Sequence, residues 1–231
     1  MASFTKIITK KNENLLIKKF IVEFKRQLAK KIKERKRFTF VLTGGKSPIK
    51  LYKNLAKEKL PWSKVDFFIG DERHVNINSK YSNFLMCKKY LLSRIKITKS
   101  QIYNISTKDS PIKDSIAYNK KIKDYFLNKK AIFDLVLLGL GEDGHIASLS
   151  KKTLSSNISK IKKNKNVEFV LWKDFSRITL NIKCINNSKK IFLWAPNKRQ
   201  KKIIKNIISD KKLKYPASYL RSKGTFLFHC D

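Results

Sequence analysis

Six of the seven glycines in this 231-residue chain lie in three short segments, and each segment follows an apolar run typical of a β-strand. Glycine permits backbone conformations with positive φ and a close approach to a ligand. The three segments are residues 43–48, 69–73 and 139–145. Because the carboxyl ends of parallel strands meet at one edge of a sheet, the pattern predicts a small-molecule site at that edge.

Apolar β-like runs alternate with helical patterns along most of the chain. Leu16, Phe20, Phe24 and Leu28 recur at four-residue spacing and predict an amphipathic helix over residues 15–32. We expect strands at residues 38–42, 65–69, 133–138, 167–172, 177–182 and 191–195, with residues 226–228 closing the sheet. Further helices are expected after Ser47-Pro48 and at residues 82–92, 112–127 and 198–208, and a polar surface loop at residues 150–166.

This alternation predicts an α/β fold with a mostly parallel, Rossmann-like sheet flanked by helices on both faces. No repeat and no convincing linker divides the sequence, so we expect a single domain over residues 1–231. Apolar residues make up 42% of the chain, which is enough to form a core despite the high charge.

The formal net charge is +37, from 54 Lys and Arg against 17 Asp and Glu. Such an excess can indicate a polyanionic partner, but here the basic residues are spread over the whole chain. The abundance of Lys with Ile and Asn is also typical of A/T-rich coding sequence. We therefore expect no specific nucleic-acid partner, although the positive field should attract anionic substrates.

Cys87, Cys184 and Cys230 are far apart and show neither zinc-ligand spacing nor a disulfide framework, which predicts reduced thiols and no metal. Residues 1–14 lack the apolar core of a signal peptide, and no apolar run is long enough to span a membrane. We expect a cytoplasmic protein that does not associate with membranes and is a monomer or a weak homo-oligomer.

The first glycine segment contains Gly44 and Gly45, followed by Ser47-Pro48. Ser can cap a helix, and Pro is favoured at the first helical position. Free amides at such a helix start can bind a phosphate. An ordinary tight turn before a capped helix is the alternative. The spacing of a nucleotide-binding P-loop is absent.

The second segment places Asp71, Glu72 and Arg73 directly after a predicted buried strand. Arg is suited to bidentate contact with phosphate or carboxylate groups, and the two acids can orient sugar hydroxyls or hold the Arg. A solvated charged turn is the alternative interpretation.

The third segment has three glycines around Glu142, Asp143 and His145. A histidine at a strand end, beside a carboxylate and flanked by glycine, is a candidate general base. A structural histidine in a turn is the alternative. His74 and His229 lack this setting.

Together these motifs resemble the 6-phosphogluconolactonase family, within the larger group that includes glucosamine-6-phosphate deaminase. The resemblance covers about residues 40–220 and is carried by residues 44–48, 70–73, 82–83, 133–149 and 177–180, and by Lys198. Gly-Asp-Glu-Arg at residues 70–73 and Ala147-Ser148-Leu149 resemble the lactonases. The deaminases carry Asp-Glu-Tyr and Ala-Phe-Asn-Glu-Pro at these places.

The resemblance implies hydrolysis of 6-phosphoglucono-1,5-lactone, a small sugar-phosphate lactone, with no metal or organic cofactor. It implies that His145 activates the attacking water and that Asp143 positions His145 or the substrate. Arg73, Arg177 and Lys198 are the cations implied around the phosphate. The other implied substrate-binding residues are Gly44, Gly45, Ser47, Asp71, Glu72 and Gly144.

The chain departs from the family pattern at three places. Residues 150–152 replace a glycine-containing continuation, Ala195 or Pro196 stands where a glycine precedes the late lysine, and Lys46 stands where Ser is frequent. Two other functions stay open. One is an amino-sugar-phosphate isomerase-deaminase, and the other is a basic nucleic-acid-binding protein on the same scaffold, which the acidic pair Glu142-Asp143 disfavours.

Overall fold

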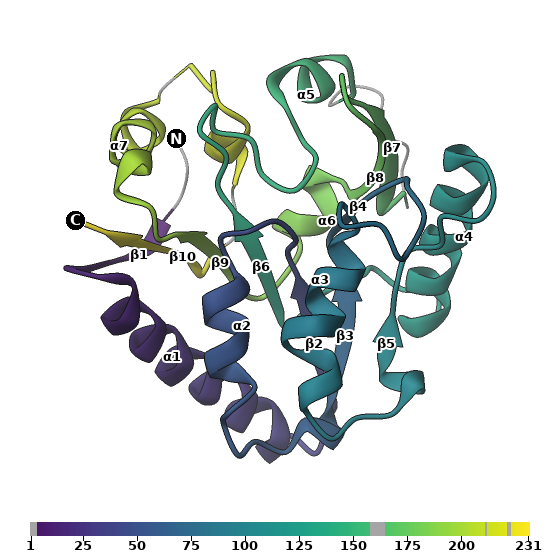
Figure 1. The fold of residues 1–231 in the computed structure, drawn as a ribbon, viewed down its shortest axis with the longest axis horizontal. Coiled ribbons are helices and arrows are strands. Elements are labelled where there is room, and N and C mark those ends of the chain that lie inside the picture. The colour runs from purple at the N-terminus through teal and green to yellow at the C-terminus, as the bar shows by residue number, and fades with distance from the viewer. Residues whose placement is uncertain (1–3, 158–164, 211, 221–222) are drawn as a thin grey trace.

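The computed structural model describes residues 4–157, 165–210, 212–220 and 223–231 (Figure 1). Among these residues, seven strands form one fully parallel sheet in the order β1-β10-β9-β6-β2-β3-β5. The strands are β1 (Phe4–Lys10), β2 (Phe38–Leu42), β3 (Val65–Ile69), β5 (Ile102–Tyr103), β6 (Leu135–Gly139), β9 (Ile191–Ala195) and β10 (Thr225–Cys230). The predicted α/β fold is confirmed.

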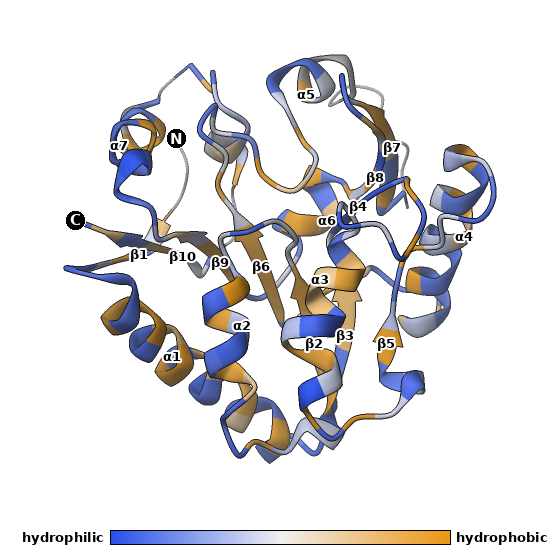
Figure 2. Ribbon diagram, viewed as in Figure 1, coloured by the Kyte–Doolittle hydropathy of each residue, from blue (hydrophilic) through white to orange (hydrophobic). Residues whose placement is uncertain are grey.

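Helices cover both faces of this sheet, with α1 on one face and α4 on the other. The helices of the described residues are α1 (Glu13–Lys33), α2 (Ile49–Leu55), α3 (Asn83–Tyr90), α4 (Pro111–Tyr125), α5 (Lys151–Asn157), α6 (Ile182–Asn186) and α7 (Lys201–Ser209). The apolar stripe predicted for the first helix is buried in α1, where Phe20 packs against Phe192 and Phe24 against Phe40. Figure 2 shows hydrophobic residues concentrated in the central strands and on the inner side of α1.

Successive residues of β3 show how the two faces are filled. Phe67 contacts Phe40 on the face that α1 covers, whereas Phe68 contacts Tyr125 of α4 and Phe133 on the opposite face. Side chains alternate along a strand, so a strand that is buried on both faces needs a nearly continuous apolar run. This requirement explains why the central strands are recognisable in the sequence.

A smaller antiparallel sheet in the described residues has the order β4-β8-β7, with β4 at Asp71–Arg73, β7 at Val167–Leu171 and β8 at Ser176–Leu180. The strands predicted at residues 167–172 and 177–182 pair here, outside the parallel sheet. Residues 71–73, predicted as part of a loop, form a strand that pairs with β8. In this pairing Arg73 lies directly opposite Arg177.

Three other expectations differ from the structure. The strand at residues 226–228 does not close the sheet, because β1 pairs outside β10; β1 is largely exposed and lysine-containing, as edge strands often are. The predicted loop at residues 150–166 begins with α5, and its residues 158–164 lie outside the described part. Ser47 does not cap α2, because Pro48 is the residue that precedes the helix and no side chain caps it.

The strand order reverses at β2. After β2 the chain adds β3 and β5 on one side, and then crosses to the other side to add β6, β9 and β10. In open parallel sheets, ligands bind beyond the carboxyl ends of the strands at such a switch point, here beyond β2 and β6. Within the described residues, no helix is long and apolar enough to cross a membrane.

Candidate active site

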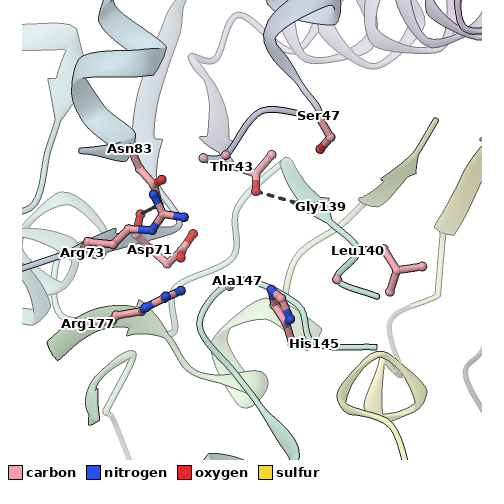
Figure 3. Close-up of a pocket in the computed structure, with 13 residues that line it drawn as sticks. Thr43, Ser47, Asp71, Arg73, Asn83, Gly139, Leu140, His145, Ala147 and Arg177 are labelled. Atoms are coloured by element: carbon pink, nitrogen blue, oxygen red, sulfur yellow. Dashed lines mark hydrogen bonds between the residues drawn. The ribbon is translucent and has the colours of Figure 1, made fainter. Parts of the chain in front are cut away.

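A pocket opens beyond the carboxyl ends of β2 and β6, where the small antiparallel sheet meets the large one (Figure 3). Its walls come from all three glycine-containing segments and from β8. The lining residues are Thr43, Gly44, Gly45, Ser47, Asp71, Arg73, Asn83, Gly139, Leu140, Gly141, His145, Ala147 and Arg177. Seven residues predicted from sequence line this pocket together: Gly44, Gly45, Ser47, Asp71, Arg73, His145 and Arg177.

Asp143 lies behind the histidine. Its Oδ1 is 2.6 Å from His145 Nδ1 and accepts a second hydrogen bond from the His145 backbone amide at 3.1 Å. Burial alone would raise the pKa of Asp143, but the amide and the imidazole of His145 outweigh burial and lower it. An ionised carboxylate can only accept, so Nδ1 carries the proton, and Nε2 is the nitrogen that can act as a base.

The missing side chain at Gly141 leaves the space that the His145 imidazole occupies. A Cβ at residue 141 would occupy the same space as His145 Nδ1 and Cε1. The backbone of Gly141 does not have positive φ, so the requirement here is space and not conformation. The sequence pattern of glycine next to His145 therefore has a direct steric explanation.

Gly141→Ala is expected to lower kcat on the order of 100-fold, because it displaces the imidazole from its position against Asp143. Gly139→Ala is the matched comparison in the same segment. Its Cβ would make only ordinary contacts, 3.7 Å from Ser47 Oγ and Thr43 Oγ1, so we expect a clearly smaller loss. Steady-state kinetics of the two variants test this, and similar losses in both would contradict it.

Two arginines face the pocket from neighbouring strands. Arg73 of β4 and Arg177 of β8 are directly opposed in the antiparallel ladder, which normally brings the two Cβ atoms to about 5 Å. Like charges at this spacing repel each other. Arg73 donates Nη1 to the Tyr81 carbonyl at 2.8 Å, and Arg177 donates Nη2 to Asp174 at 2.8 Å. The pair makes this end of the pocket suited to an anion.

Three buried polar atoms around the pocket have no hydrogen-bond partner within the described residues. They are Nε of Arg73, Nε of Arg177 and Oδ1 of Asn83. Buried polar atoms normally have partners, because leaving one unpaired costs about 1–3 kcal/mol. Two donors and one acceptor of this kind fit a ligand that carries an anionic group and a hydroxyl.

The orientation of Asn83 is fixed by its neighbours. Nδ2 donates to the Asp71 carbonyl at 2.8 Å, and a carbonyl can only accept, so Oδ1 points the other way. The side chain also fills the space that a Cβ on Gly44 would take. Asn83 belongs to the Ser-Asn motif at residues 82–83, and the motif alone does not indicate this role.

Glu72 does not line the pocket, which differs from its expected contact with substrate. In β4 the side chains alternate, so Asp71 and Arg73 face the pocket while Glu72 points away. Its carboxylate accepts from the amides of Asn83 and Phe84, at 2.6 and 2.7 Å, at the start of α3. Burial raises the pKa of Glu72 to about 6, and this group stabilises the helix start.

Gly144 and Lys198 also lie outside the pocket lining. Gly144 has a φ of +80° and supports the turn, and its carbonyl accepts from the Ala217 amide at 3.0 Å. Lys198 is exposed on a 3₁₀ helix, Lys198–Gln200. The inward side chain of that helix is Gln200, which donates to the Leu140 carbonyl.

Two further residues of the site carry little signal in the sequence. Thr43 Oγ1 accepts from the Gly139 amide at 3.2 Å and so joins the first segment to the third (Figure 3). Trp172, predicted only as the end of a strand, contacts both His145 and Arg177. The contacts Thr43–Gly139 and Trp172–His145 join segments that are distant in sequence, so no local pattern predicts them. Among the described residues, no three His, Cys, Asp or Glu side chains are grouped as a metal site.

Comparison of the chain with known proteins agrees with this geometry. A family model described as glucosamine-6-phosphate isomerases/6-phosphogluconolactonase matches residues 11–228, so the chain belongs to this family. A 6-phosphogluconolactonase of Synechocystis sp. is 30% identical over 227 residues, covering 95% of this chain and 92% of the relative. The 6-phosphogluconolactonase of Thermotoga maritima is 30% identical over 211 residues, covering 88% and 89%.

A solved structure of a family member has the same fold as this chain. The crystal structure of 6-phosphogluconolactonase from Thermotoga maritima superimposes with a TM-score of 0.83 at 27% identity. The match covers 97% of this chain and 99% of that chain. The α/β fold of this chain is therefore that of its family.

Proposed function

We propose that this chain hydrolyses 6-phosphoglucono-1,5-lactone to 6-phosphogluconate in the oxidative pentose phosphate pathway. Relatives named 6-phosphogluconolactonase match nearly its whole length at 30% identity. One structural observation carries the proposal: a carboxylate-supported imidazole lines the same pocket as two adjacent arginines, whose Nε atoms have no hydrogen-bond partner in the described part of the chain. In Figure 3, His145 reaches the pocket from one side, and Arg73 and Arg177 reach it from the other.

The chemistry follows from this arrangement. His145 Nε2 takes a proton from the water that attacks the lactone carbonyl carbon, and the negative charge develops on the carbonyl oxygen. Backbone amides of the glycine-containing segments can donate to that oxygen. The C1–ring oxygen bond then breaks, and the ring oxygen leaves with the proton held by His145. This gives a free C5 hydroxyl and a C1 carboxylic acid, which releases its remaining proton to solvent and becomes the carboxylate, while His145 returns to its neutral form.

Asp143 and the two arginines have separate tasks. Asp143 keeps the proton on Nδ1 and stabilises the imidazolium that forms, through its 2.6 Å contact. Arg73 and Arg177 bind the phosphate, beside Gly45 and Ser47 in the pocket wall. Oδ1 of Asn83 accepts from a sugar hydroxyl and so gains the partner that it lacks.

The test is direct. The lactone is generated in situ by oxidation of glucose 6-phosphate, and its loss is followed with and without the protein. We expect loss well above the spontaneous rate, no ammonia from glucosamine 6-phosphate, and no salt-resistant oligonucleotide binding. A rate equal to the spontaneous background would overturn the proposal, and ammonia release would favour the deaminase branch.

We also propose a single domain over residues 1–231, a cytoplasmic location, and a monomeric or weakly oligomeric state. The pairing of β1 with β10 joins both ends of the chain in one sheet, which supports a single domain. Cys87, Cys184 and Cys230 are buried and free, which suits a reducing compartment. Size-exclusion chromatography with light scattering measures the oligomeric state.

A further inference from the structure

We propose that Trp172 is a positioning residue that holds His145 and Arg177 in their working orientations on one indole ring. The proposal rests on the proposed lactonase function for its kinetic readout. Trp172 lies in the turn between β7 and β8, where its amide donates to the Phe175 carbonyl at 3.3 Å. This turn also carries Asp174 and is followed by Arg177, so one hairpin supplies three connected side chains.

The indole contacts one residue from each end of the pocket. The His145 ring lies 5.1 Å from the Trp172 ring, centroid to centroid, at an interplanar angle of 77°. The Arg177 Cζ lies 4.0 Å from the Trp172 ring centroid. The first geometry is a favourable edge-to-face aromatic pair, and the second is a cation–π contact. One side chain thus restrains both the proposed base and a proposed phosphate ligand.

The indole is itself held in place. Its Nε1 donates to the Ser148 carbonyl at 2.9 Å, and the Ser148 hydroxyl donates to Asp71 Oδ2 at 2.7 Å. Ser148 is fully buried, so the Ser148–Asp71 hydrogen bond is shielded from water, and the bond from Trp172 is partly buried. The orientation of Trp172 is therefore fixed relative to the segment that follows His145 and relative to β4.

The position of the Arg177 guanidinium depends on Trp172, because the ion pair of Arg177 with Asp174 is a weak restraint. Both carboxylate oxygens of Asp174 accept from Nη2, at 2.9 and 2.8 Å, but the Asp174 side chain is 52% exposed. Ion pairs with exposed partners contribute little to holding a side chain. Arg73, directly opposite, repels Arg177. Without the indole face, the guanidinium would leave the position in which its unpaired Nε is available to a ligand.

The experiment compares Trp172→Leu with Trp172→Phe in the full chain. Leu removes the aromatic face, whereas Phe keeps the face and loses only the Nε1 donor. We expect Trp172→Leu to raise KM about tenfold, the effect of losing one cation–π contact, and to lower kcat several-fold. The KM of Trp172→Phe should lie close to that of the wild type. Thermal melting checks that both variants fold.

A second readout separates this proposal from the proposed function. Calorimetry of inorganic phosphate binding should show about tenfold weaker affinity in Trp172→Leu than in the wild type. An inactive wild type would reject the lactonase function, yet a weakened phosphate affinity would still support the positioning role. Unchanged KM and phosphate affinity in Trp172→Leu would overturn it, as would equal effects of Leu and Phe that follow only the melting temperature.

Discussion

Replacing His145 with glutamine should lower kcat for lactone hydrolysis by roughly a hundredfold or more and change KM only a few-fold. Glutamine can still accept a hydrogen bond in the pocket, but it cannot take the proton from water at neutral pH. The phosphate end of the pocket, at Arg73 and Arg177, stays intact in this variant. Initial rates, corrected for spontaneous hydrolysis, give both constants.

Asp143→Asn is the matched control for the role of His145. The amide keeps the shape of the carboxylate but removes the charge that fixes the proton on Nδ1. We expect a loss of kcat that approaches that of His145→Gln, with KM again nearly unchanged. Full activity of His145→Gln would remove the imidazole from the proposed mechanism, whatever Asp143→Asn does.

Arg73→Gln and Arg177→Gln should each raise KM roughly 10- to 100-fold and change kcat much less. Each substitution removes a charge-assisted hydrogen bond to the phosphate, which is worth about 1.5–3 kcal/mol. Because Arg73 and Arg177 are neighbours in the ladder and would bind one anion, the effects of the double variant should not be additive. KM and phosphate affinity are measured for all three variants.

Arg177→Lys is the control for charge alone. It keeps the cation but loses the planar group that lies on Trp172. We expect its KM to fall between those of the wild type and Arg177→Gln. If all the arginine variants bind phosphate as tightly as the wild type does, the anion binds elsewhere.

The central strands could be predicted because their signal is local. Strands such as β2 and β3 are buried on both faces and therefore appear as nearly continuous apolar runs, each interrupted by one polar residue, Thr39 or Asp66. The strand β1 carries lysines on an exposed edge, and β4 consists of three charged residues, so their strand state depends on pairing with β10 and β8. Such pairing is a long-range property that no local pattern encodes.

The same distinction applies to the site. The glycine segments indicated the pocket because close packing and sharp turns require glycine locally, as Gly141 shows. The direction of each side chain depended on the pairing of β4, which turned Glu72 away from the pocket. Lys198 was predicted by resemblance alone, and the structure turns Gln200 inward in that short helix. The assignments of the remaining site residues stay predictions until the variants are measured.

The opposed arginines also affect the thermal stability of the chain. Backbone pairing of β4 with β8 keeps Arg73 and Arg177 directly opposite each other, and the contact with Trp172 holds the Arg177 guanidinium at the pocket, so the chain without ligand keeps part of their mutual repulsion. A bound phosphate compensates it, and any ligand specific to the native state adds about 2.7 kcal/mol at a hundred times its Kd. The protein should therefore unfold at a higher temperature in phosphate than in chloride of equal ionic strength, and cellular sugar phosphates would act as its stabilisers.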